Sequence, residues 1–284
     1  MEYFKDAVSL VTGGASGIGR ALCGELSRQG STVILADIDT ASAERIAAEL
    51  RKDGGNALAL FLDVRDLAAF RKAADMIVRR YGKIDFLFNV AGIGLNAEVR
   101  DTTPEMWKEI LDIDLSGVYY GISSIYPIMI RQKSGHIINI SSAWGLTPFP
   151  LMSAYSAAKH GVFALSAILA IEASEFGIHV TTVCPGNIDT PHHDRLKYIG
   201  YDKARIRSKG SRPLDVTKCA RIILNGVARR KRIIVIQASL KIAWFAYRLM
   251  PRLYLRALSG PIYAMIKRAR TSREPRDGDL PGRG

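Results

Sequence analysis

The stretch Ala7–Asp37, AVSLVTGGASGIGRALCGELSRQGSTVILAD, indicates the fold of this chain. It reads as an apolar strand, a glycine-rich turn, an amphipathic helix and a second apolar strand, which is the pattern of a dinucleotide-binding βαβ unit. Gly13 allows the tight turn, Gly17 lets the backbone approach a pyrophosphate, and Gly19 lets the helix pack close to the strand. A glycine cluster on its own could also be an ordinary strand-to-helix turn.

An acidic residue ends the second strand of this unit. Asp37 stands eighteen residues after Gly19, where a carboxylate binds the adenosine ribose hydroxyls and repels a 2′-phosphate. No basic residue precedes Gly17 or immediately follows Asp37. We therefore expect NAD rather than NADP, with its phosphates at the helix N-terminus beside Ser16 and Ile18.

A tyrosine and a lysine form the candidate catalytic pair. Tyr155 and Lys159 stand four residues apart in YSAAKHGVFALSAILAIEA, a segment with helical periodicity, so both side chains point from one helical face. A nearby ammonium favours the phenolate and brings the tyrosine pKa from about 10 toward neutral pH. Such a tyrosine exchanges a proton with a substrate oxygen, which Ser142, thirteen residues upstream, could also hydrogen-bond. The Tyr-x-x-x-Lys pattern alone would fit a surface coincidence.

Six motifs in this order and spacing resemble the short-chain dehydrogenase/reductase family, over roughly residues 5–236. They are Thr12-Gly13-x-x-x-Gly17-Ile18-Gly19, Asp63-Val64, Asn89-Val90-Ala91-Gly92, Ser142, Tyr155-x-x-x-Lys159, and Pro185-Gly186 with Thr190. The resemblance implies that Tyr155 is the acid/base, that Ser142 orients the substrate oxygen, and that Lys159 binds the nicotinamide ribose and lowers the tyrosine pKa. It also implies cofactor contacts by Asp63 and Val64 at the adenine, by Asn89, Ala91 and Gly92 along the cofactor, where they also support the sheet, and by Pro185, Gly186, Ile188 and Thr190, with Thr190 at the carboxamide.

Two positions depart from the family pattern. The family usually has an asparagine where this chain has Asp114, in LDIDLSGVYYG, and that asparagine holds a water in a proton relay to the lysine. A carboxylate could accept the same hydrogen bonds, or it could pull on Lys159 and alter the pKa of Tyr155. Where the family has two consecutive asparagines, this chain has Asn89-Val90, and we interpret this change as a matter of side-chain packing. We include Asp114 in the catalytic set, and the departure leaves open a catalytically silent NAD-binding protein.

Further apolar runs alternate with helical patterns along the chain. They are TVILA, ALALFLD, IDFLFNVAG, HIINIS, HVTTVCPG and RIIVIQ. This alternation predicts an α/β fold, a Rossmann-like doubly wound parallel sheet of about seven strands with helices on both faces. With 284 residues, 48% of them hydrophobic, the chain can form one large domain. We place this catalytic domain at residues 1–236, with a substrate lid at 191–212.

The cysteines and histidines give no sign of a metal site. Cys23, Cys184 and Cys219 lack a paired spacing and are interpreted as core residues of a reduced, intracellular protein. The pair His192-His193 lies in the expected lid and is interpreted as a loop or a substrate contact. We expect no metal.

No targeting or spanning segment is expected, and the protein is predicted to be cytoplasmic. The chain enters its first strand without a basic leader or apolar signal core. The longest uncharged run, Leu115–Ile130, contains Pro127 and is shorter than the ~20 residues that span a bilayer. It is interpreted instead as a dimer-forming helix, with Gly161–Ile171 as the second helix of the four-helix interface common in the family. A homodimer or homotetramer follows.

The residues around the catalytic motifs are apolar. Trp144 and Phe149 follow Ser142, Leu151 and Met152 precede the Tyr155 helix, and Leu95 follows the cofactor motif. Trp144, Phe149, Leu95 and His193 are our candidate substrate contacts, although some of these side chains could simply be core. Such a lining suits a lipophilic alcohol or ketone.

The last part of the chain, residues 237–284, is basic and apolar. Within SLKIAWFAYRLMPRLYLRALSGPIYAMIKRAR, the basic residues Lys241, Arg248, Arg252 and Arg256 fall near one helical face. Pro251 is expected to break the segment into two helices. Basic amphipathic helices with aromatic residues suit an anionic membrane surface. Packing over the substrate cleft or against a dimer partner is an equal alternative, while the apolar content argues against nucleic acid.

Together these patterns predict an NAD-dependent short-chain oxidoreductase that acts on a lipophilic alcohol or ketone, such as a steroid, retinoid-like, fatty or aromatic alcohol. A reductase of ketones or 3-oxoacyl groups is the alternative within the enzyme class. The substrate, the physiological direction and the choice between dimer and tetramer stay open.

Overall fold

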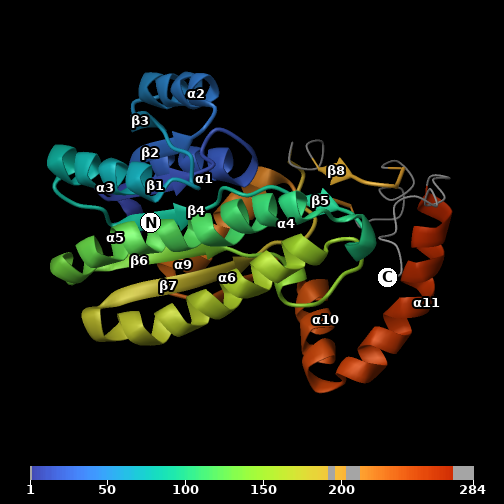
Figure 1. The fold of residues 1–284 in the computed structure, drawn as a ribbon. Coiled ribbons are helices and arrows are strands. Elements are labelled where there is room, and N and C mark those ends of the chain that lie inside the picture. Colours follow the sequence, from blue (N-terminus) through green and yellow to red (C-terminus); the bar gives the residue numbers. More distant parts are fainter. Residues whose placement is uncertain (1, 191–195, 203–211, 271–284) are drawn as a thin grey trace.

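The computed structural model describes residues 2–190, 196–202 and 212–270 and is built on one parallel sheet (Figure 1). Seven strands lie in the order β3-β2-β1-β4-β6-β7-β9. Their bounds are β1 Val8–Thr12, β2 Thr32–Asp37, β3 Asn56–Phe61, β4 Phe86–Asn89, β6 Gly135–Ile140, β7 Ile178–Cys184 and β9 Ile233–Val235. Every adjacent pair is parallel, which confirms the predicted sheet.

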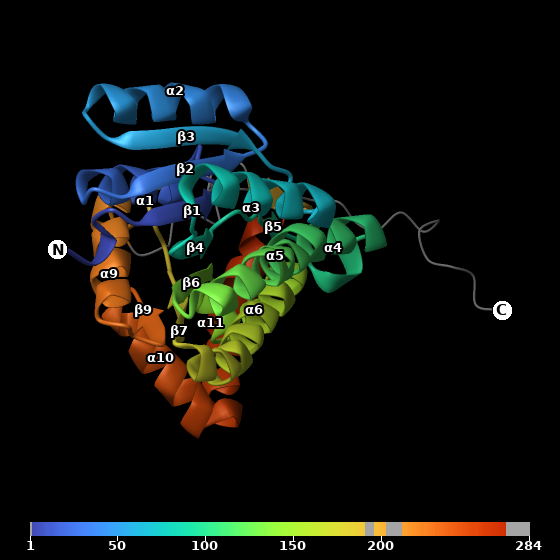
Figure 2. The same ribbon diagram turned by 90° about the vertical axis from the view of Figure 1, so that its left-hand side faces the viewer.

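Helices cover both faces of the sheet, as a doubly wound fold requires (Figure 2). One face carries α1 Gly17–Arg28, α2 Thr40–Lys52 and α9 Val216–Ala228. The other carries α3 Leu67–Tyr81, α5 Gly117–Gln132 and α6 Ser153–Glu172. A shorter helix, α4 Pro104–Leu111, precedes a π-helical turn, Asp112–Ser116, that leads directly into α5. Short 3-10 turns occupy Glu2–Phe4, Val99–Asp101, Ala143–Gly145 and Ala173–Phe176.

The strand order creates the place where a ligand can bind. The chain passes from β1 outward through β2 to β3, and then returns to the other side of β1 for β4. Because consecutive connections leave in opposite directions at this point, the carboxyl ends of β1 and β4 border an open crevice. The glycine-rich turn follows β1, so it lies at the mouth of that crevice.

A two-stranded parallel pair lies apart from the main sheet and was not predicted. It joins β5 Leu95–Asn96 to β8 Lys197–Tyr198. Each strand has only two residues, too few for a period-2 pattern to appear in the sequence. Of the lid predicted at 191–212, residues 191–195 and 203–211 lie outside the described residues.

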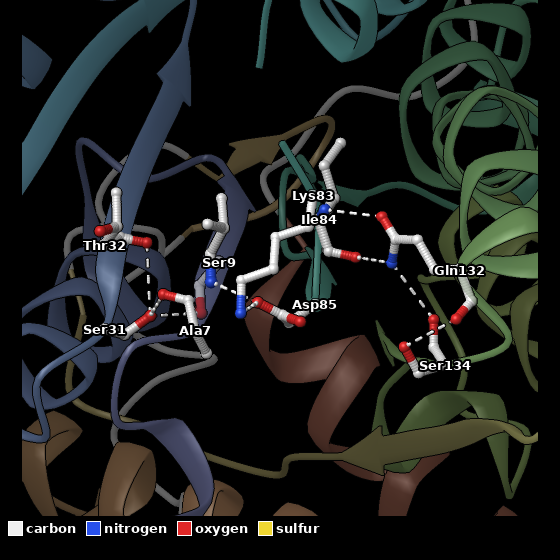
Figure 3. Close-up of polar contacts among 10 residues, drawn as sticks. Ala7, Ser9, Ser31, Thr32, Lys83, Ile84, Asp85, Gln132 and Ser134 are labelled. Atoms are coloured by element: carbon white, nitrogen blue, oxygen red, sulfur yellow. Dashed lines mark hydrogen bonds and ion pairs between the residues drawn. The ribbon is translucent and has the colours of Figure 1, made fainter. Parts of the chain in front are cut away.

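Polar contacts connect the strands at their amino ends, on the side of the sheet opposite the crevice (Figure 3). The Asp85 carboxylate accepts a hydrogen bond from the Val8 amide at 2.7 Å and pairs with Lys83 at 3.0 Å. The Ser31 hydroxyl donates to the Ala7 carbonyl at 2.9 Å. The Gln132 side chain, at the end of α5, accepts from the Ile84 amide at 3.0 Å and donates to the Ile84 carbonyl at 2.9 Å. These contacts hold the strands together at the end of the sheet that lies far from the crevice.

The Gln132 hydrogen bonds at this end of the sheet give a prediction about stability that does not depend on catalysis. The substitution Gln132→Ala leaves both backbone groups of Ile84 without their side-chain partner, so we expect a loss of about 1–3 kcal/mol of unfolding free energy. Thermal unfolding monitored by circular dichroism measures it. The adjacent exposed Arg131 provides the control, since Arg131→Ala should change stability by less than ~0.5 kcal/mol. Equal melting temperatures for the two variants would contradict the prediction.

The C-terminal extension forms two helices that make a hairpin. They are α10 Ala238–Leu249 and α11 Pro251–Ala269, and Pro251 opens the second helix as the sequence predicted. The junction of α10 and α11 lies on the side of the molecule opposite α2 in both views (Figures 1 and 2). Residues 271–284 lie outside the described residues.

Among the described residues, one helical stretch is long and apolar enough to cross a membrane by length and composition alone. It is Ser153–Phe176, which comprises α6 and the turn after it, and its most apolar window has a mean hydropathy of 1.3. Buried residues such as Val162 and Leu169 join α6 to the core on one face of the sheet. We therefore interpret α6 as a helix that packs one face against the core, with 33% of the apolar window buried.

Candidate active site

A cleft of about 630 Å³ opens at the carboxyl ends of the central strands. It brings together residues that are far apart in the sequence, including most of those predicted to bind a cofactor or to catalyse. The predicted residues that line it are Gly13, Ser16, Gly17, Ile18, Gly19, Asp37, Asp63, Val64, Ala91, Gly92, Asp114, Ser142, Trp144, Tyr155, Lys159, Pro185, Gly186, Ile188 and Thr190.

The glycine-rich turn leaves no room for side chains at its critical positions. A Cβ added to Gly19 would lie 2.1 Å from the Gly13 carbonyl oxygen, and one added to Gly13 would lie 3.0 Å from the Ala91 backbone. Gly13 and Gly17 have φ angles of 67° and 50°, which L side chains rarely adopt. The N-cap residue Ser16 makes no side-chain capping bond. The first amides of α1 therefore have no side-chain cap, which fits a pyrophosphate at this end of the helix.

Asp37 has its carboxylate fixed at the end of β2. One oxygen accepts a hydrogen bond from the Ala15 amide and the other from the Asp39 amide, each at 3.0 Å. These bonds hold the carboxylate beside the cleft, while each oxygen keeps further acceptor capacity. The arrangement fits a ribose diol, and its negative charge opposes a phosphate at the same place.

Arg65 is a cleft residue that the sequence reasoning missed. Its guanidinium binds the Asp63 carboxylate through two nitrogens, with Nε–Oδ1 and Nη2–Oδ2 distances of 3.0 and 2.6 Å. The side-chain hydrogen bond from Arg65 is the main reason that the pKa of Asp63 lies below its usual value. Because two nitrogens of its guanidinium already bind Asp63, Arg65 has fewer hydrogen-bond donors for a 2′-phosphate than an unpaired arginine would.

The helix α6 presents Tyr155 and Lys159 on one face, as the four-residue spacing predicted. The Lys159 Nζ lies 5.6 Å from the centroid of the Tyr155 ring. Ser142 follows β6 at the start of a 3-10 turn and hydrogen-bonds the Tyr155 side chain. The serine hydroxyl also accepts from the Trp144 amide at 3.2 Å, which holds it toward the cleft. A hydroxyl, a phenol and an ammonium thus converge on one end of the cleft.

Asp114 lies in direct contact with Lys159 rather than at a distance from it. Its Oδ2 is 3.1 Å from the Lys159 Nζ, and both side chains are buried, at 0% and 5% exposure. Its Oδ1 accepts a hydrogen bond from the Ile93 amide at 2.8 Å. The Lys159 ammonium also donates to the Ile140 carbonyl at 3.2 Å. The π-helical turn places Asp114 here, at the type of bulge that often marks a functional site.

The Asp114–Lys159 contact is an ion pair with poor hydrogen-bond angles. Asp114 Oδ2 is buried and has no partner with hydrogen-bonding geometry, despite its distance from the ammonium. The attraction is therefore mainly Coulombic. The oxygen also keeps an acceptor position that a water could use.

The pKa of Tyr155 differs from the expectation. Burial raises it most, the Lys159 ammonium lowers it, the Asp114 carboxylate raises it, and the Ser142 hydrogen bond lowers it, so the net pKa lies above the usual value. The sequence-based prediction of a net decrease was wrong, because it included the ammonium and left out burial and a second charge. Burial lowers the pKa of Lys159, but Asp114 and Tyr155 raise it by more, so the lysine stays protonated.

Among the described residues, three of the predicted site residues do not line the cleft. Asn89 is 2% exposed and lies below the cleft, where its side-chain amide donates to Asn139 at 2.8 Å. Leu95 is 4% exposed and packs in a small core cluster. Phe149 stacks on Trp144 with 4.2 Å between ring centroids and contacts the cleft only through it. His193 lies outside the described residues.

Further lining residues come from segments without a motif. They include Ile93, Glu109, Ile113 and Leu196. Glu109 belongs to α4 and pairs with Lys197 at 3.2 Å, next to Leu196. The contact depends on helix α4 meeting the distant strand β8, so no local sequence signal could have indicated it.

Three comparisons place this geometry among known proteins. The family model described as short chain dehydrogenase matches residues 7–198. Cyclopentanol dehydrogenase of Comamonas sp. is 38% identical over 191 residues, which are 67% of this chain and 76% of that enzyme. The 2,5-dichloro-2,5-cyclohexadiene-1,4-diol dehydrogenase LinX of Sphingobium indicum is 34% identical over 184 residues, 65% of this chain and 74% of that enzyme. A crystal structure of a short chain dehydrogenase/reductase from Burkholderia phymatum in complex with NAD has a TM-score of 0.79 and 25% identity, and covers 89% of this chain and 96% of that one.

Proposed function

The chain belongs to the short-chain dehydrogenase family and is an oxidoreductase of that type, and we propose that it transfers hydride between NAD and a lipophilic alcohol or ketone. The observation that carries the proposal is that one cleft is lined by Ser142, Tyr155 and Lys159 together with the glycine-rich turn and Asp37. The first three residues suit an alcohol oxygen, and the turn and Asp37 suit a dinucleotide.

NAD would supply the hydride acceptor or donor, and the residues of the chain would handle the proton. In alcohol oxidation, the Tyr155 phenolate takes the hydroxyl proton, while the Ser142 hydroxyl donates a hydrogen bond to the same oxygen. The positive charge of the Lys159 ammonium stabilises the phenolate, and Asp114 keeps the ammonium charged. In reduction the same groups act in the opposite direction, and Tyr155 gives its proton to the oxygen of the new alcohol. The backbone of the glycine-rich turn and Asp37 would hold the cofactor.

An apolar wall supports a lipophilic substrate. Trp144, Met152, Ile93 and Leu196 line the cleft near the catalytic side chains. The catalytic side chains would bind the alcohol oxygen, and these four apolar side chains would contact the rest of the substrate. The two relatives act, by their names, on cyclopentanol and on a dichlorocyclohexadienediol. A cyclic or aromatic alcohol is therefore our preferred substrate class.

Absorbance at the reduced-nicotinamide band tests this proposal. The purified chain is mixed with NAD or NADP and a panel of cyclic, steroid, aromatic, fatty and short alcohols, and matching ketones are offered with the reduced cofactors. Turnover with NAD and a bulky apolar alcohol is expected. Cofactor binding without turnover of any substrate would favour a silent NAD-binding protein, for which the Asp114–Lys159 ion pair is the supporting observation.

The choice of NAD over NADP gives a separate prediction. The substitution Asp37→Asn keeps an acceptor for the Ala15 amide but removes the charge, so we expect the NADP-to-NAD ratio of kcat/KM to rise roughly 10- to 100-fold. Initial rates with both cofactors measure the ratio. The variant Asp39→Asn, which also alters a carboxylate beside the cleft, should leave the ratio nearly unchanged. Equal effects of the two variants would contradict an Asp37 contact with the ribose.

Exposed apolar residues support a homo-oligomer built on α5 and α6. Tyr119 on α5 is 52% exposed, and Ile168 and Ile171 on α6 are 55% and 70% exposed. We propose that these helices pair with their copies in a second chain, in the cytoplasm. Light scattering of the chain in solution measures the assembly.

A further inference from the structure

The hairpin of α10 and α11 is fixed to the body of the protein at both of its ends. Near the start of α10, Leu240 and Trp244 pack against a cluster that contains Val235 and Cys184. The Trp244 ring meets Phe163 of α6 edge to face at 6.0 Å. The side of α10 that faces the body of the protein is thus already packed against apolar side chains.

The far end of α11 is fixed beside the cleft. Ile266 and Ala269 are 7% and 1% exposed and pack against Leu151 and Tyr201. Arg270 and Tyr201 both bind the Glu98 carboxylate. Leu151 precedes Met152, which lines the cleft, so α11 ends next to the cleft wall.

The outward face of α10 is an apolar stripe. Ile242, Phe245 and Leu249 are 72%, 65% and 62% exposed. They are spaced three and four residues apart, so they lie along one side of the helix, opposite the partly buried side that carries Leu240 and Trp244. At the junction of the helices, Met250 and Leu253 continue the stripe with 52% and 59% exposure. We call these five residues the apolar edge.

Basic side chains flank the apolar edge. Lys241 and Arg248 are exposed on α10, and Arg252 and Arg256 are exposed on α11. Residues 238–270 contain no aspartate or glutamate. The Arg248 guanidinium lies 5.5 Å from the centre of the Trp244 ring, which holds it beside the stripe. An apolar strip bordered only by positive charge is complementary to an anionic lipid surface, with acyl chains below and phosphates above.

We propose that the apolar edge and its basic border dock this protein on an anionic phospholipid membrane, with the hairpin junction inserted at the interface. A second copy of the chain fits the surface less well. A two-fold contact would set the arginines and Lys241 against their own copies, and residues 238–270 carry no carboxylate to pair with them. Nucleic acid would use the charge and leave the apolar edge exposed to water.

Docking in this way sets the distance between the lipid and the cleft. The 19 residues of α11 separate the inserted junction from the cleft wall at Leu151, a helix length of roughly 28 Å. The docking itself does not depend on any activity.

Vesicle flotation with the full chain tests the docking. We expect binding to vesicles of phosphatidylcholine with about 30% phosphatidylglycerol, little binding to pure phosphatidylcholine, and release as salt rises from about 0.05 to 0.5 M. The double variant Phe245→Ser and Leu249→Ser should lower the partition coefficient at least about tenfold. The double variant Arg252→Gln and Arg256→Gln should lower it by roughly tenfold and weaken its salt dependence.

Matched variants elsewhere on the surface provide the controls. Phe61 is 60% exposed on β3, so Phe61→Ser removes an exposed apolar side chain far from the hairpin and should leave vesicle binding unchanged. Lys72→Gln with Arg79→Gln removes two exposed charges from α3 in the same way. Circular dichroism melting checks that every variant is folded.

Absence of vesicle binding by the folded wild-type chain would overturn the proposal, as would equal losses in the hairpin variants and the controls. A fall in solution mass for Phe245→Ser and Leu249→Ser, without vesicle binding by the wild type, would assign the apolar edge to a second copy instead. None of these readouts uses NAD or an alcohol, so the docking and the proposed function can fail separately.

Discussion

Replacement of Tyr155 by phenylalanine is expected to lower kcat for alcohol oxidation by roughly 10³-fold and to change NAD affinity by less than about threefold. In the proposed mechanism the hydroxyl exchanges a proton with the substrate, and its oxygen is the only non-hydrogen atom that the substitution removes. The ring that lies over Lys159 stays in place. Cofactor binding, by contrast, is proposed to depend mainly on the glycine-rich turn and Asp37, which the substitution does not touch.

A matched tyrosine controls for the loss of a hydroxyl. Tyr126 is on α5, packs edge to face on Phe176 and does not line the cleft. The substitution Tyr126→Phe should therefore keep kcat within about twofold of the wild type. Steady-state rates give kcat, and quenching of protein fluorescence by NAD gives the affinity. If Tyr155→Phe kept even a tenth of the wild-type rate, the proton would have to move through another group.

The parts of the site that the sequence predicted are those fixed by local geometry. Any Cβ at position 19 would lie 2.1 Å from the carbonyl oxygen of Gly13 in the same glycine-rich turn, so only glycine fits there. Tyr155 and Lys159 share a face because four residues make about one turn of a helix. Most strands appear as apolar runs because helices cover both faces of a parallel sheet and bury its inner strands, whereas the edge strand β3 keeps Phe61 60% exposed.

The parts that the sequence did not predict depend on segments that meet only in the folded chain. The ion pair between Asp114 and Lys159 joins a π-helical turn to α6, and Glu109 reaches the cleft from α4. Leu95 shows the reverse error, since its apolar character suited a substrate wall equally well but it is buried in the core. Hydrophobicity alone does not separate a pocket wall from a core side chain.

The pKa of Tyr155 illustrates the same limit for electrostatics. The spacing to Lys159 gave the sign of one contribution correctly, because the ammonium does lower the pKa. Burial and Asp114 act in the opposite direction, and neither is visible in a four-residue spacing. Whether a buried tyrosine is a phenol or a phenolate depends on the sum of these effects, which requires the folded structure.

Asp114 is the residue whose replacement should have the second large effect, and two substitutions separate its roles. Asp114→Ala removes the partner of a buried ammonium and the acceptor of the Ile93 amide, so we expect a loss of about 3–5 kcal/mol of unfolding free energy. Asp114→Asn keeps an oxygen for the Ile93 amide and for a bridging water, so it should lose less stability than the alanine variant. Thermal and urea unfolding measure both losses.

The asparagine variant also tests how Asp114 acts on Tyr155. In the wild type the carboxylate raises the pKa of Tyr155, so the phenolate that oxidation needs forms only as pH rises. Removal of this negative charge lowers the tyrosine pKa, and the rising limb of kcat/KM against pH for alcohol oxidation should move to lower pH in Asp114→Asn. The matched variant Asp112→Asn changes a half-buried carboxylate that pairs with Lys108 on the preceding helical turn and should leave the profile in place.

The pH profile also separates positioning from mere support of the fold. If Asp114 only held Lys159 in position, Asp114→Asn would change the height of the profile and leave its midpoint where it is in the wild type. A moved midpoint with a stable fold would instead mean that the charge of Asp114 sets the protonation of Tyr155 through the pair of buried ions. Since the family usually has asparagine here, the direction of the shift would also show what the carboxylate does in this chain: it keeps Lys159 charged and makes the tyrosine a weaker acid than the ammonium alone would.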